Sequence, residues 1–386
     1  MALLVRQYHR NQQLIVFFSY QLFIFNYKLL FSRHSMSYQI IIKPSDHALK
    51  VESGETILEA ALREGFSLPY GCRNGSCGIC KGTIIQGAVD YGHPSEEALT
   101  EDEKQAGKAL FCCASPLTDL VIECHEIGAT KDIEIKTLPC RVHNLELVAP
   151  DVMVISLKLP TNQRLQFLAG QYIDILLKDG KRRSFSLANA PHDDEFLQLH
   201  ARNYPGGAFT EHVFTHMRVK DILRFTGPLG SFFLRDAPED TSIIFLASGT
   251  GFAPIKSILE HIFHQENGRY KKMRMTLYWG ARKRADLYLA DLADKWQQQH
   301  KNFTFVPVLS EPLPTDNWEG RIGLVHEAVM QDYRSLIKHQ VYACGAPAMV
   351  KAAYHDFTNL RNLPKDAFFS DVFTPSTSNP QVVQES

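Results

Sequence analysis

The chain has 386 residues, and 41 lysines and arginines against 42 aspartates and glutamates give a formal net charge of −1. One hydrophobic core rarely serves so many residues, so we expect two or three domains in series. The even balance of charge excludes a broad basic surface, and with it a nucleic-acid partner. Four of the eight cysteines lie between positions 72 and 112, and this crowding favours a metal centre in a reducing compartment, the cytoplasm, over disulfides.

The first 35 residues differ in composition from the rest of the chain. Residues 14–31 are dominated by large apolar and aromatic side chains, but four polar side chains interrupt them and no small-residue cleavage site follows. Two interpretations stay open, a weak membrane anchor and an upstream start codon ahead of Met36. We expect no membrane partner and leave residues 1–35 out of the fold interpretation.

Residues 36–128 have the pattern of a small α+β module. The expected elements, in chain order, are a strand at 38–43, a helix at 55–63, a short helix capped by Thr100 and Glu103, and a strand at 120–123. The segment 129–137 is charged and poor in apolar residues, so it predicts a linker.

The next two modules are distinguished by the order of their strands and helices. Residues 138–236 alternate short strands with turns rich in Gly, Pro and Asp, which predicts an antiparallel barrel. Its clearest strands are 152–159, 171–177 and 196–202. Residues 240–374 instead alternate apolar strands with helices, and this order predicts a parallel α/β nucleotide-binding domain. The polar segment 375–386 predicts a disordered tail.

Four cysteines are spaced for a [2Fe-2S] cluster. The pattern C-x4-C-x2-C places Cys72, Cys77 and Cys80 on one loop, and Cys112 follows at the distance typical of plant-type clusters. Glycines at 71, 75 and 78 would let backbone N–H groups wrap closely around the sulfurs. A structural zinc site is the alternative, but such sites usually have two separate C-x2-C pairs.

A fifth cysteine, Cys113, stands beside the expected fourth ligand. Consecutive residues of a strand point to opposite faces, so only one of the pair is expected to reach the cluster. In plant-type ferredoxins the ligand begins the pattern C-x-x-x-P, which Cys112 and Pro116 match. This resemblance selects Cys112 and leaves Cys113 as a small core residue. Cys124 and Cys140 belong to no pattern and are expected to be inert buried thiols.

The segment Arg183-Ser-Phe-Ser186 is similar to the R-x-Y-S flavin motif of the ferredoxin-NADP reductase superfamily, with Phe185 in place of tyrosine. The resemblance implies that Arg183, with Ser184 beside it, holds an FAD phosphate, because a guanidinium fits a pair of phosphate oxygens. It also implies that Phe185 packs on the isoalloxazine ring and that Ser186 bonds near the flavin N5 atom. The further FAD contacts implied by the superfamily are Tyr172, Gly207, Ala208 and Thr210.

A glycine loop follows the expected strand at 243–247. The loop has the pattern G-x-G-x-x-P, made by Gly249, Thr250, Gly251 and Pro254. Its backbone amides would bind a diphosphate at the start of the next helix, although a simple β–α turn is the alternative for this pattern alone. The superfamily implies further residues: Arg282 beside the adenine ribose, Cys344 and Gly345 beside the nicotinamide, and Phe373 across the flavin. Ser186, Cys344 and Phe373 are the expected catalytic residues.

Within the superfamily, the stretches 182–191, 246–254 and 368–371 are most similar to CDP-6-deoxy-glucoseen reductases. The resemblance implies an NAD(P)H-dependent FAD and [2Fe-2S] reductase that takes a hydride and passes single electrons to a partner enzyme. That partner would be a pyridoxamine-phosphate (PMP)-dependent sugar dehydrase, with an oxygenase component as the alternative. A free-flavin reductase and a non-enzymatic ferredoxin carrier are the competing functions. The cluster motif argues against the first, and the flavin and nucleotide motifs argue against the second.

The sequence gives opposing signs for the choice between NADH and NADPH. Arg282 and Arg284 would attract a 2′-phosphate, whereas Asp286 would repel one. We expect NADH to be preferred.

Overall fold

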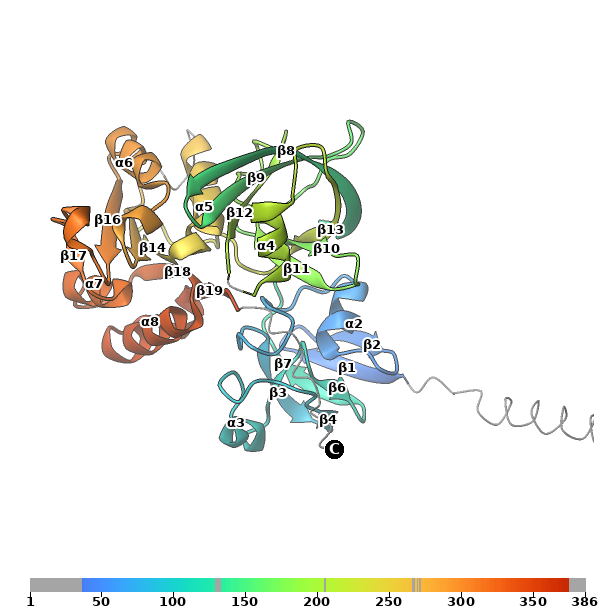
Figure 1. Cartoon of the computed structure of the whole chain (residues 1–386). Coiled ribbons are helices and arrows are strands. Elements are labelled where there is room, and N and C mark those ends of the chain that lie inside the picture. The colour runs from blue at the N-terminus through green and yellow to red at the C-terminus, as the bar shows by residue number, and fades with distance from the viewer. Residues whose placement is uncertain are drawn as a thin grey trace, which may run out of the picture.

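The computed structural model describes residues 37–374, except 129–132, Pro205, 266–267, Arg269 and Lys271. The expected N-terminal extension, the tail and part of the linker therefore lie outside the described residues. Three sheet-centred modules follow one another along the chain, and β19 (Phe368–Val372) lies near the point where they meet (Figure 1). Within the part that the structure describes, we find no helix whose length and hydropathy would carry it across a membrane.

The first module is a mixed five-stranded sheet with the order β2-β1-β7-β3-β5. Its first and last strands by sequence, β1 and β7, run parallel, and the other pairs are antiparallel. The helix α2 (Ile57–Arg63) buries its apolar face in the core of this module and begins with a capping box at Thr56. The five strands are β1 (Tyr38–Lys43), β2 (His47–Val51), β3 (Lys81–Gln86), β5 (Lys108–Leu110) and β7 (Leu120–Glu123).

Smaller elements surround the cysteine loop. The strands β4 (Val89–Asp90) and β6 (Ser115–Pro116) form a separate antiparallel pair. The helix α3 (Glu101–Gln105) begins at Thr100, whose hydroxyl and the Glu103 carboxylate make the capping box that the sequence predicts.

The second module is a six-stranded antiparallel sheet with the order β11-β10-β13-β8-β9-β12. Its longest strand, β8 (Lys136–Ala149), pairs with β13 through its first half and with β9 through its second. The sheet curls around its own core (Figure 1). The remaining elements are β9 (Val152–Lys158), β10 (Tyr172–Leu176), β11 (Arg182–Ser186), β12 (Leu197–Arg202), α4 (Ala208–Thr215) and β13 (Ile222–Leu229).

A continuous ladder does not close the expected barrel. Between its two edge strands, the described residues form one isolated bridge, Leu187 to Leu199. The alternation of apolar residues predicts strands, but it is a local signal and does not specify whether the two edges of a sheet pair. Lys136 and Thr137, expected in the linker, already belong to β8.

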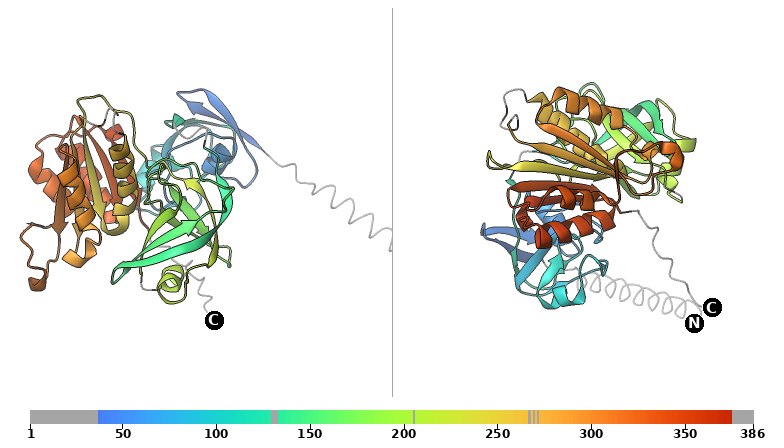
Figure 2. Two further views of the ribbon diagram at one scale, coloured as in Figure 1. Left: turned by 90° about the horizontal axis from the view of Figure 1, so that it is seen from above. Right: turned by 90° about the vertical axis from the view of Figure 1, so that its left-hand side faces the viewer.

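The third module is a wholly parallel sheet, as predicted, with the order β17-β16-β15-β14-β18-β19. Strand β14 is apolar along its length because helices cover both faces of the sheet (Figure 2). Phe245 packs with α5 and α6, and Leu246 packs with α7 and α8. The elements are β14 (Ser242–Ser248), α5 (Phe252–His264), β15 (Met275–Ala281), α6 (Ala290–Gln299), β16 (Phe303–Leu309), β17 (Arg321–Ile322), α7 (Val325–Asp332), β18 (His339–Gly345) and α8 (Pro347–Leu360).

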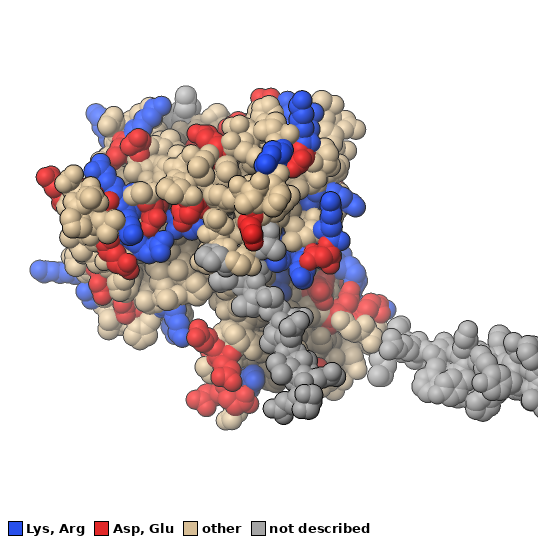
Figure 3. Space-filling model, in the orientation of Figure 1, with Lys and Arg blue, Asp and Glu red and all other residues tan. Residues whose placement is uncertain are grey.

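Short 3-10 turns join these elements. They are Gly249–Gly251, Arg284–Asp286, Pro314–Asp316 and Lys365–Ala367. Positive and negative side chains alternate over most of the visible face, while acidic ones gather at the end of the molecule that carries α3 (Figure 3). The first turn of that helix contributes Glu101, Asp102 and Glu103.

Candidate electron-transfer site

The four expected cluster ligands lie as two pairs. Cys77 lies beside Cys72, whose backbone N–H donates to the Cys77 sulfur at 3.5 Å, and Cys80 lies beside Cys112. Among the residues described, no group of three or more His, Cys, Asp or Glu is placed to hold a single metal ion. Two separate pairs instead suit a binuclear cluster, in which each iron takes two thiolates.

The contact within each pair favours a thiolate at one of its two sulfurs. The contact with Cys77, aided by backbone N–H groups of Asn74 and Ser76, lowers the pKa of Cys72 to about 6. Contacts with Cys113 and Cys80 lower the pKa of Cys112 to about 3. The contact with the partner sulfur, and then burial, raise the pKa of the Cys77 and Cys80 thiols. Two of the four sulfurs therefore favour the thiolate form that binds metal.

Glycines make the loop close-fitting. Gly75 has φ +78°, and a Cβ on it would lie 2.7 Å from the Cys113 sulfur. A Cβ on Gly71 would lie 2.7 Å from Ile79 Cδ1. The backbone thus approaches the sulfurs at positions where a side chain would not fit, as a [2Fe-2S] cluster requires.

Cys112 and Cys113 do not lie on a strand, so the prediction that their side chains point to opposite faces is wrong. Both residues lie in a turn after β5, where the N–H groups of Cys113 and Ala114 each donate to the Leu110 carbonyl at 2.9 Å. The chain therefore reverses, and the two sulfurs lie 3.7 Å apart on the same side. Cys113 is half-buried beside the ligand loop and is not a core residue.

We still expect Cys112 to be the ligand, because its sulfur is the one paired with Cys80. The variant Cys113→Ser should keep its full content of iron and labile sulfide, since a serine hydroxyl can still donate to the Cys112 sulfur. Cys112→Ser should lose the paramagnetic signal of the reduced cluster. The reverse pattern in electron paramagnetic resonance (EPR) spectra would assign the ligand to Cys113.

The flavin motif occupies β11, and its four side chains range from exposed at Ser184 to buried at Ser186. Ser184 donates to the Asp174 carboxylate at 2.7 Å, and Ser186 is buried. Arg183 is half-buried, and its guanidinium donates to the Arg182 carbonyl at 2.8 Å, which leaves most of its donors for a phosphate. Phe185 is also half-buried and lies 5.5 Å from the ring of Phe209 on α4.

The second predicted flavin segment begins α4. Gly207 is the N-cap residue and Ala208 the first helical residue. The Thr210 hydroxyl donates to the Gly207 carbonyl at 2.9 Å, and a Cβ on Gly207 would lie 2.5 Å from that hydroxyl. The first amides of this helix are free of side-chain caps, so they suit an anionic group such as a diphosphate.

The predicted nucleotide loop joins β14 to α5. Residues Gly249–Gly251 form a 3-10 turn, and Pro254 lies in the first turn of the helix, as expected. A Cβ on Gly251 would lie 2.1 Å from the Cys344 carbonyl oxygen, and one on Gly345 would lie 2.2 Å from Ser248 Oγ. Two loops at the carboxyl ends of adjacent parallel strands therefore pack backbone to backbone, at the edge where such sheets bind nucleotides.

The basic residues expected near the adenine ribose already have partners. Arg282 Nε lies 3.4 Å from the Asp286 carboxylate. Arg284 is bonded to Asp316 through its backbone N–H and its guanidinium. These contacts leave the pair of arginines less available to a 2′-phosphate.

Asp371, which the sequence reasoning did not assign to the site, lies at the junction of the three modules. It lies beside Ser186 of the flavin motif and pairs with Cys344 across β18 and β19. A Cβ on Gly71 of the cysteine loop would lie 3.6 Å from its Oδ1 atom. Burial, and then the nearby charge of Cys72, raise the pKa of Asp371 to about 7. The sequence signal that could have assigned Asp371 to the site was its position two residues before Phe373.

The other two expected catalytic residues lie close to this carboxyl in the chain or the sheet. Cys344 is fully buried, and burial and the Asp371 charge raise the pKa of its thiol well above the usual value. Phe373 is half-buried, and its backbone N–H donates to the Gly345 carbonyl at 2.9 Å. The structure therefore brings Ser186, Cys344 and Phe373 to one region.

Two residues of β12 were also missed. Arg202 reaches over the nucleotide loop, because its Nη1 atom lies 3.5 Å from a Cβ built on Gly249. Its Nε atom lies 3.5 Å from the Asp151 carboxylate, and its Nη2 atom is buried without a hydrogen-bond partner among the described residues. His200 bonds the Tyr288 hydroxyl at 2.8 Å, and burial lowers the pKa of His200 to about 3. In the sequence, the only signal that could have pointed to these two residues was a basic side chain at the end of an expected strand.

Tyr172, expected as a flavin contact, has its hydroxyl elsewhere. This buried side chain of β10 donates to the Gly71 carbonyl at 2.7 Å and packs in the core of the first module. Its contact in the structure is therefore with the cysteine loop.

Three family models match consecutive parts of the chain. A 2Fe-2S iron-sulfur cluster binding domain matches residues 40–117, an oxidoreductase FAD-binding domain matches 139–234, and an oxidoreductase NAD-binding domain matches 245–355. With the site geometry above, these matches define an NAD(P)H-dependent oxidoreductase that holds FAD and a [2Fe-2S] cluster.

The relatives identify the kind of oxidoreductase. The chain is 38% identical over 341 residues to the CDP-6-deoxy-L-threo-D-glycero-4-hexulose-3-dehydrase reductase of Yersinia pseudotuberculosis, covering 88% of this chain and 100% of the relative. It is 36% identical over 345 residues to the reductase component of a Pseudomonas phenol 2-monooxygenase, covering 88% and 95%. The crystal structure of the Amycolatopsis reductase GcoB superposes with a TM-score of 0.71 at 32% identity, covering 88% and 99%. The chain belongs to the family of iron-sulfur flavoprotein reductases, within the ferredoxin-NADP reductase superfamily, that supply electrons to partner enzymes.

Proposed function

We propose that this reductase prefers NADH and supplies single electrons to a PMP-dependent dehydrase acting on a CDP-linked hexulose. The position of Asp371 supports the electron route, because this one residue lies beside the flavin motif, the nicotinamide-side strand and the cysteine loop. A bound FAD would accept two electrons as a hydride and release them one at a time. The oxygenase reductases among the relatives make an oxygenase component the second candidate acceptor.

We assign the binding roles from the contacts above. Arg183 and the first amides of α4 would hold the FAD phosphates, and Phe185 would pack on the flavin ring. The loop Gly249–Gly251, with Arg202 over it, would hold the nicotinamide diphosphate. Ser186 would place its hydroxyl, oriented by Asp371, at the reacting edge of the flavin.

We also propose a domain type for each module that positions these residues. The mixed sheet with α2 packed in its core supports a β-grasp ferredoxin domain over residues 36–128, and the curled second sheet supports a barrel-like FAD domain over 138–236. The parallel sheet supports a nucleotide-binding domain over 240–374. The eight cysteines, free in the structure, support a reducing compartment such as the cytoplasm.

The preference for NADH follows from the neutralised arginines. Because Asp286 pairs with Arg282, kcat/KM for NADH should exceed that for NADPH by about 10-fold or more, the size of one lost charge-assisted contact. Asp286→Ala should lower the ratio of kcat/KM for NADH to that for NADPH, because it frees Arg282. Asp291 is an exposed carboxylate of α6, and Asp291→Ala should leave this ratio unchanged. Steady-state kinetics with ferricyanide measure both variants, and a strong NADPH preference in the parent would overturn the assignment.

Reconstitution tests the acceptor. Purified reductase, NADH and a PMP-dependent CDP-hexulose dehydrase should give turnover of the sugar nucleotide under anaerobic conditions, and an oxygenase component should not be reduced at a comparable rate. Faster reduction of the oxygenase component would favour the second candidate.

A further inference from the structure

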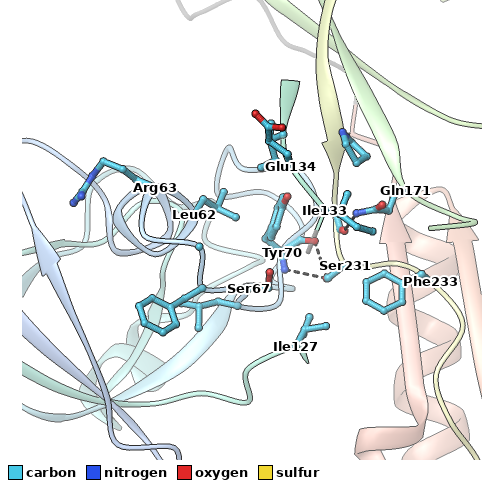
Figure 4. Close-up of a pocket in the computed structure, with 16 residues that line it drawn as sticks. Leu62, Arg63, Ser67, Tyr70, Ile127, Ile133, Glu134, Gln171, Ser231 and Phe233 are labelled. Carbon is cyan, nitrogen blue, oxygen red and sulfur yellow. Dashed lines mark hydrogen bonds between the residues drawn. The ribbon is translucent and has the colours of Figure 1, made fainter. Parts of the chain in front are cut away.

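The cysteine loop is bonded to the flavin module ahead of its first cluster ligand. The Tyr70 carbonyl accepts from the backbone N–H of Ser231 at 3.1 Å and from its hydroxyl at 2.9 Å, and the Tyr70 N–H donates back to Ser231 Oγ at 3.0 Å (Figure 4). The next carbonyl, that of Gly71, accepts from Tyr172 at 2.7 Å. Two consecutive residues before Cys72 are therefore fixed to the second module.

The residue after Cys72 is fixed by charge. The Arg73 guanidinium forms an ion pair with Asp174 of β10 and lies beside the Tyr172 hydroxyl. The Asp174 side chain is 1% exposed and the Arg73 side chain 23% exposed, so salt screens this pair far less than a surface pair. Arg73 has φ +57°, a conformation that costs energy in a residue with a side chain. The ion pair compensates for that cost only while the modules stay together.

The same strand pair carries the flavin motif. In the ladder between β10 and β11, Tyr172 lies opposite Ser186 and Asp174 lies opposite Ser184. Asp174 accepts from Ser184 with one oxygen and from Arg73 with the other. The side chains that hold the cysteine loop thus belong to residues registered directly against the flavin motif.

We propose that Arg73 is a positioning residue, which holds the cluster docked on the flavin sheet through its ion pair with Asp174. Electron transfer from flavin to cluster then occurs within one fixed unit, and the ferredoxin module does not swing between flavin and acceptor. This inference rests on the proposed electron route. The cavity of about 430 Å³ beside Tyr70 and Ser231 lies at the edge of the same interface and does not separate the contacts (Figure 4).

Single-turnover kinetics test the proposal on the full chain loaded with FAD and cluster. After anaerobic mixing with NADH, flavin bleaching and cluster reduction are followed separately. In the parent, cluster reduction should not slow as glycerol raises the viscosity. In Arg73→Met, flavin bleaching should keep its rate while cluster reduction slows roughly 10- to 100-fold, because the cluster is no longer held at a fixed distance from the flavin. Arg73→Lys should recover part of the rate, because an ammonium group can still pair with Asp174.

Two further variants separate position from charge. Ser231→Ala removes two hydrogen bonds to Tyr70 without changing charge, so it should also slow cluster reduction while the cluster midpoint potential stays at the parent value. Arg63→Met removes a cation of the same module whose ion pair with Glu55 is exposed, and it should behave like the parent. Iron content confirms that each variant holds its cluster.

The outcomes are distinct. A parent rate in Arg73→Met, or strong viscosity dependence in the parent, would overturn the docked arrangement and leave the proposed function intact. Slow transfer in Arg73→Met together with a lowered midpoint potential and a normal Ser231→Ala would also overturn it, because charge alone would then explain the rate. A parent whose flavin bleaches while its cluster stays oxidised would refute the proposed electron route, and the inference with it.

Discussion

Cys77→Ser should lose turnover of the partner enzyme to the background rate while oxidising NADH with ferricyanide as fast as the parent. Cys77 forms one of the two thiol pairs with Cys72, so its loss removes a ligand to one iron. Ferricyanide can take electrons directly from the flavin, and NADH bound to the third module can reduce the flavin without the cluster. The two activities are measured on one preparation, by dye reduction and by reconstituted partner turnover.

The matched control is Cys113→Ser, which also replaces a cysteine sulfur with a serine oxygen, but at a cysteine outside the proposed ligand set. It should keep both activities. A Cys77→Ser enzyme that drives the partner at the parent rate would place the cluster off the electron route and would restore the free-flavin reductase as the function.

Arg183→Ala should be purified largely without FAD. The guanidinium donates to the Arg182 carbonyl, and among the described residues no carboxylate forms an ion pair with it. Losing a charge-assisted contact to a phosphate costs about 1.5 to 3 kcal/mol, which weakens FAD binding roughly 10- to 150-fold. Fluorescence of released flavin and the visible absorbance of the purified protein give the occupancy.

Arg182→Ala is the control for that variant, because Arg182 is the adjacent, exposed cation on the opposite face of β11. It should keep full FAD occupancy and normal NADH oxidation. Equal occupancy in the two variants would show that Arg183 does not hold the phosphates.

The parts of the fold with a local sequence signature were predicted well. The strand at 38–43 and the Thr100 cap follow from alternation and from hydrogen bonds between near neighbours, and both are present. The parallel third sheet follows from apolar strands between helices. Barrel closure and the turn at Cys112 and Cys113 depend on contacts that no local pattern encodes. The edges of the second sheet are joined by one isolated bridge among the described residues, and the expectation that Cys112 and Cys113 lie on a strand was wrong.

The residues of the candidate site also fall into two groups, those that a sequence motif predicts and those that no motif predicts. The four cluster cysteines and the glycine loops have chemical requirements that fix their spacing, so the sequence indicates them directly. Asp371, Arg202 and the Arg73 to Asp174 pair have no motif, because their importance arises when separate modules meet. Tyr172 was assigned to the flavin from its neighbours in sequence, whereas its hydroxyl turns to Gly71 of the cysteine loop.

Anaerobic titration of the loaded enzyme with NADH tests the central claim most directly, because it counts the electrons that the chain accepts. The flavin takes two electrons and the cluster one, so both should be fully reduced after about 1.5 equivalents of NADH, with the EPR signal of the reduced cluster at full intensity. Uptake that ends at about one equivalent, with the flavin bleached and the cluster still oxidised, would contradict an electron route from NADH through FAD to the cluster.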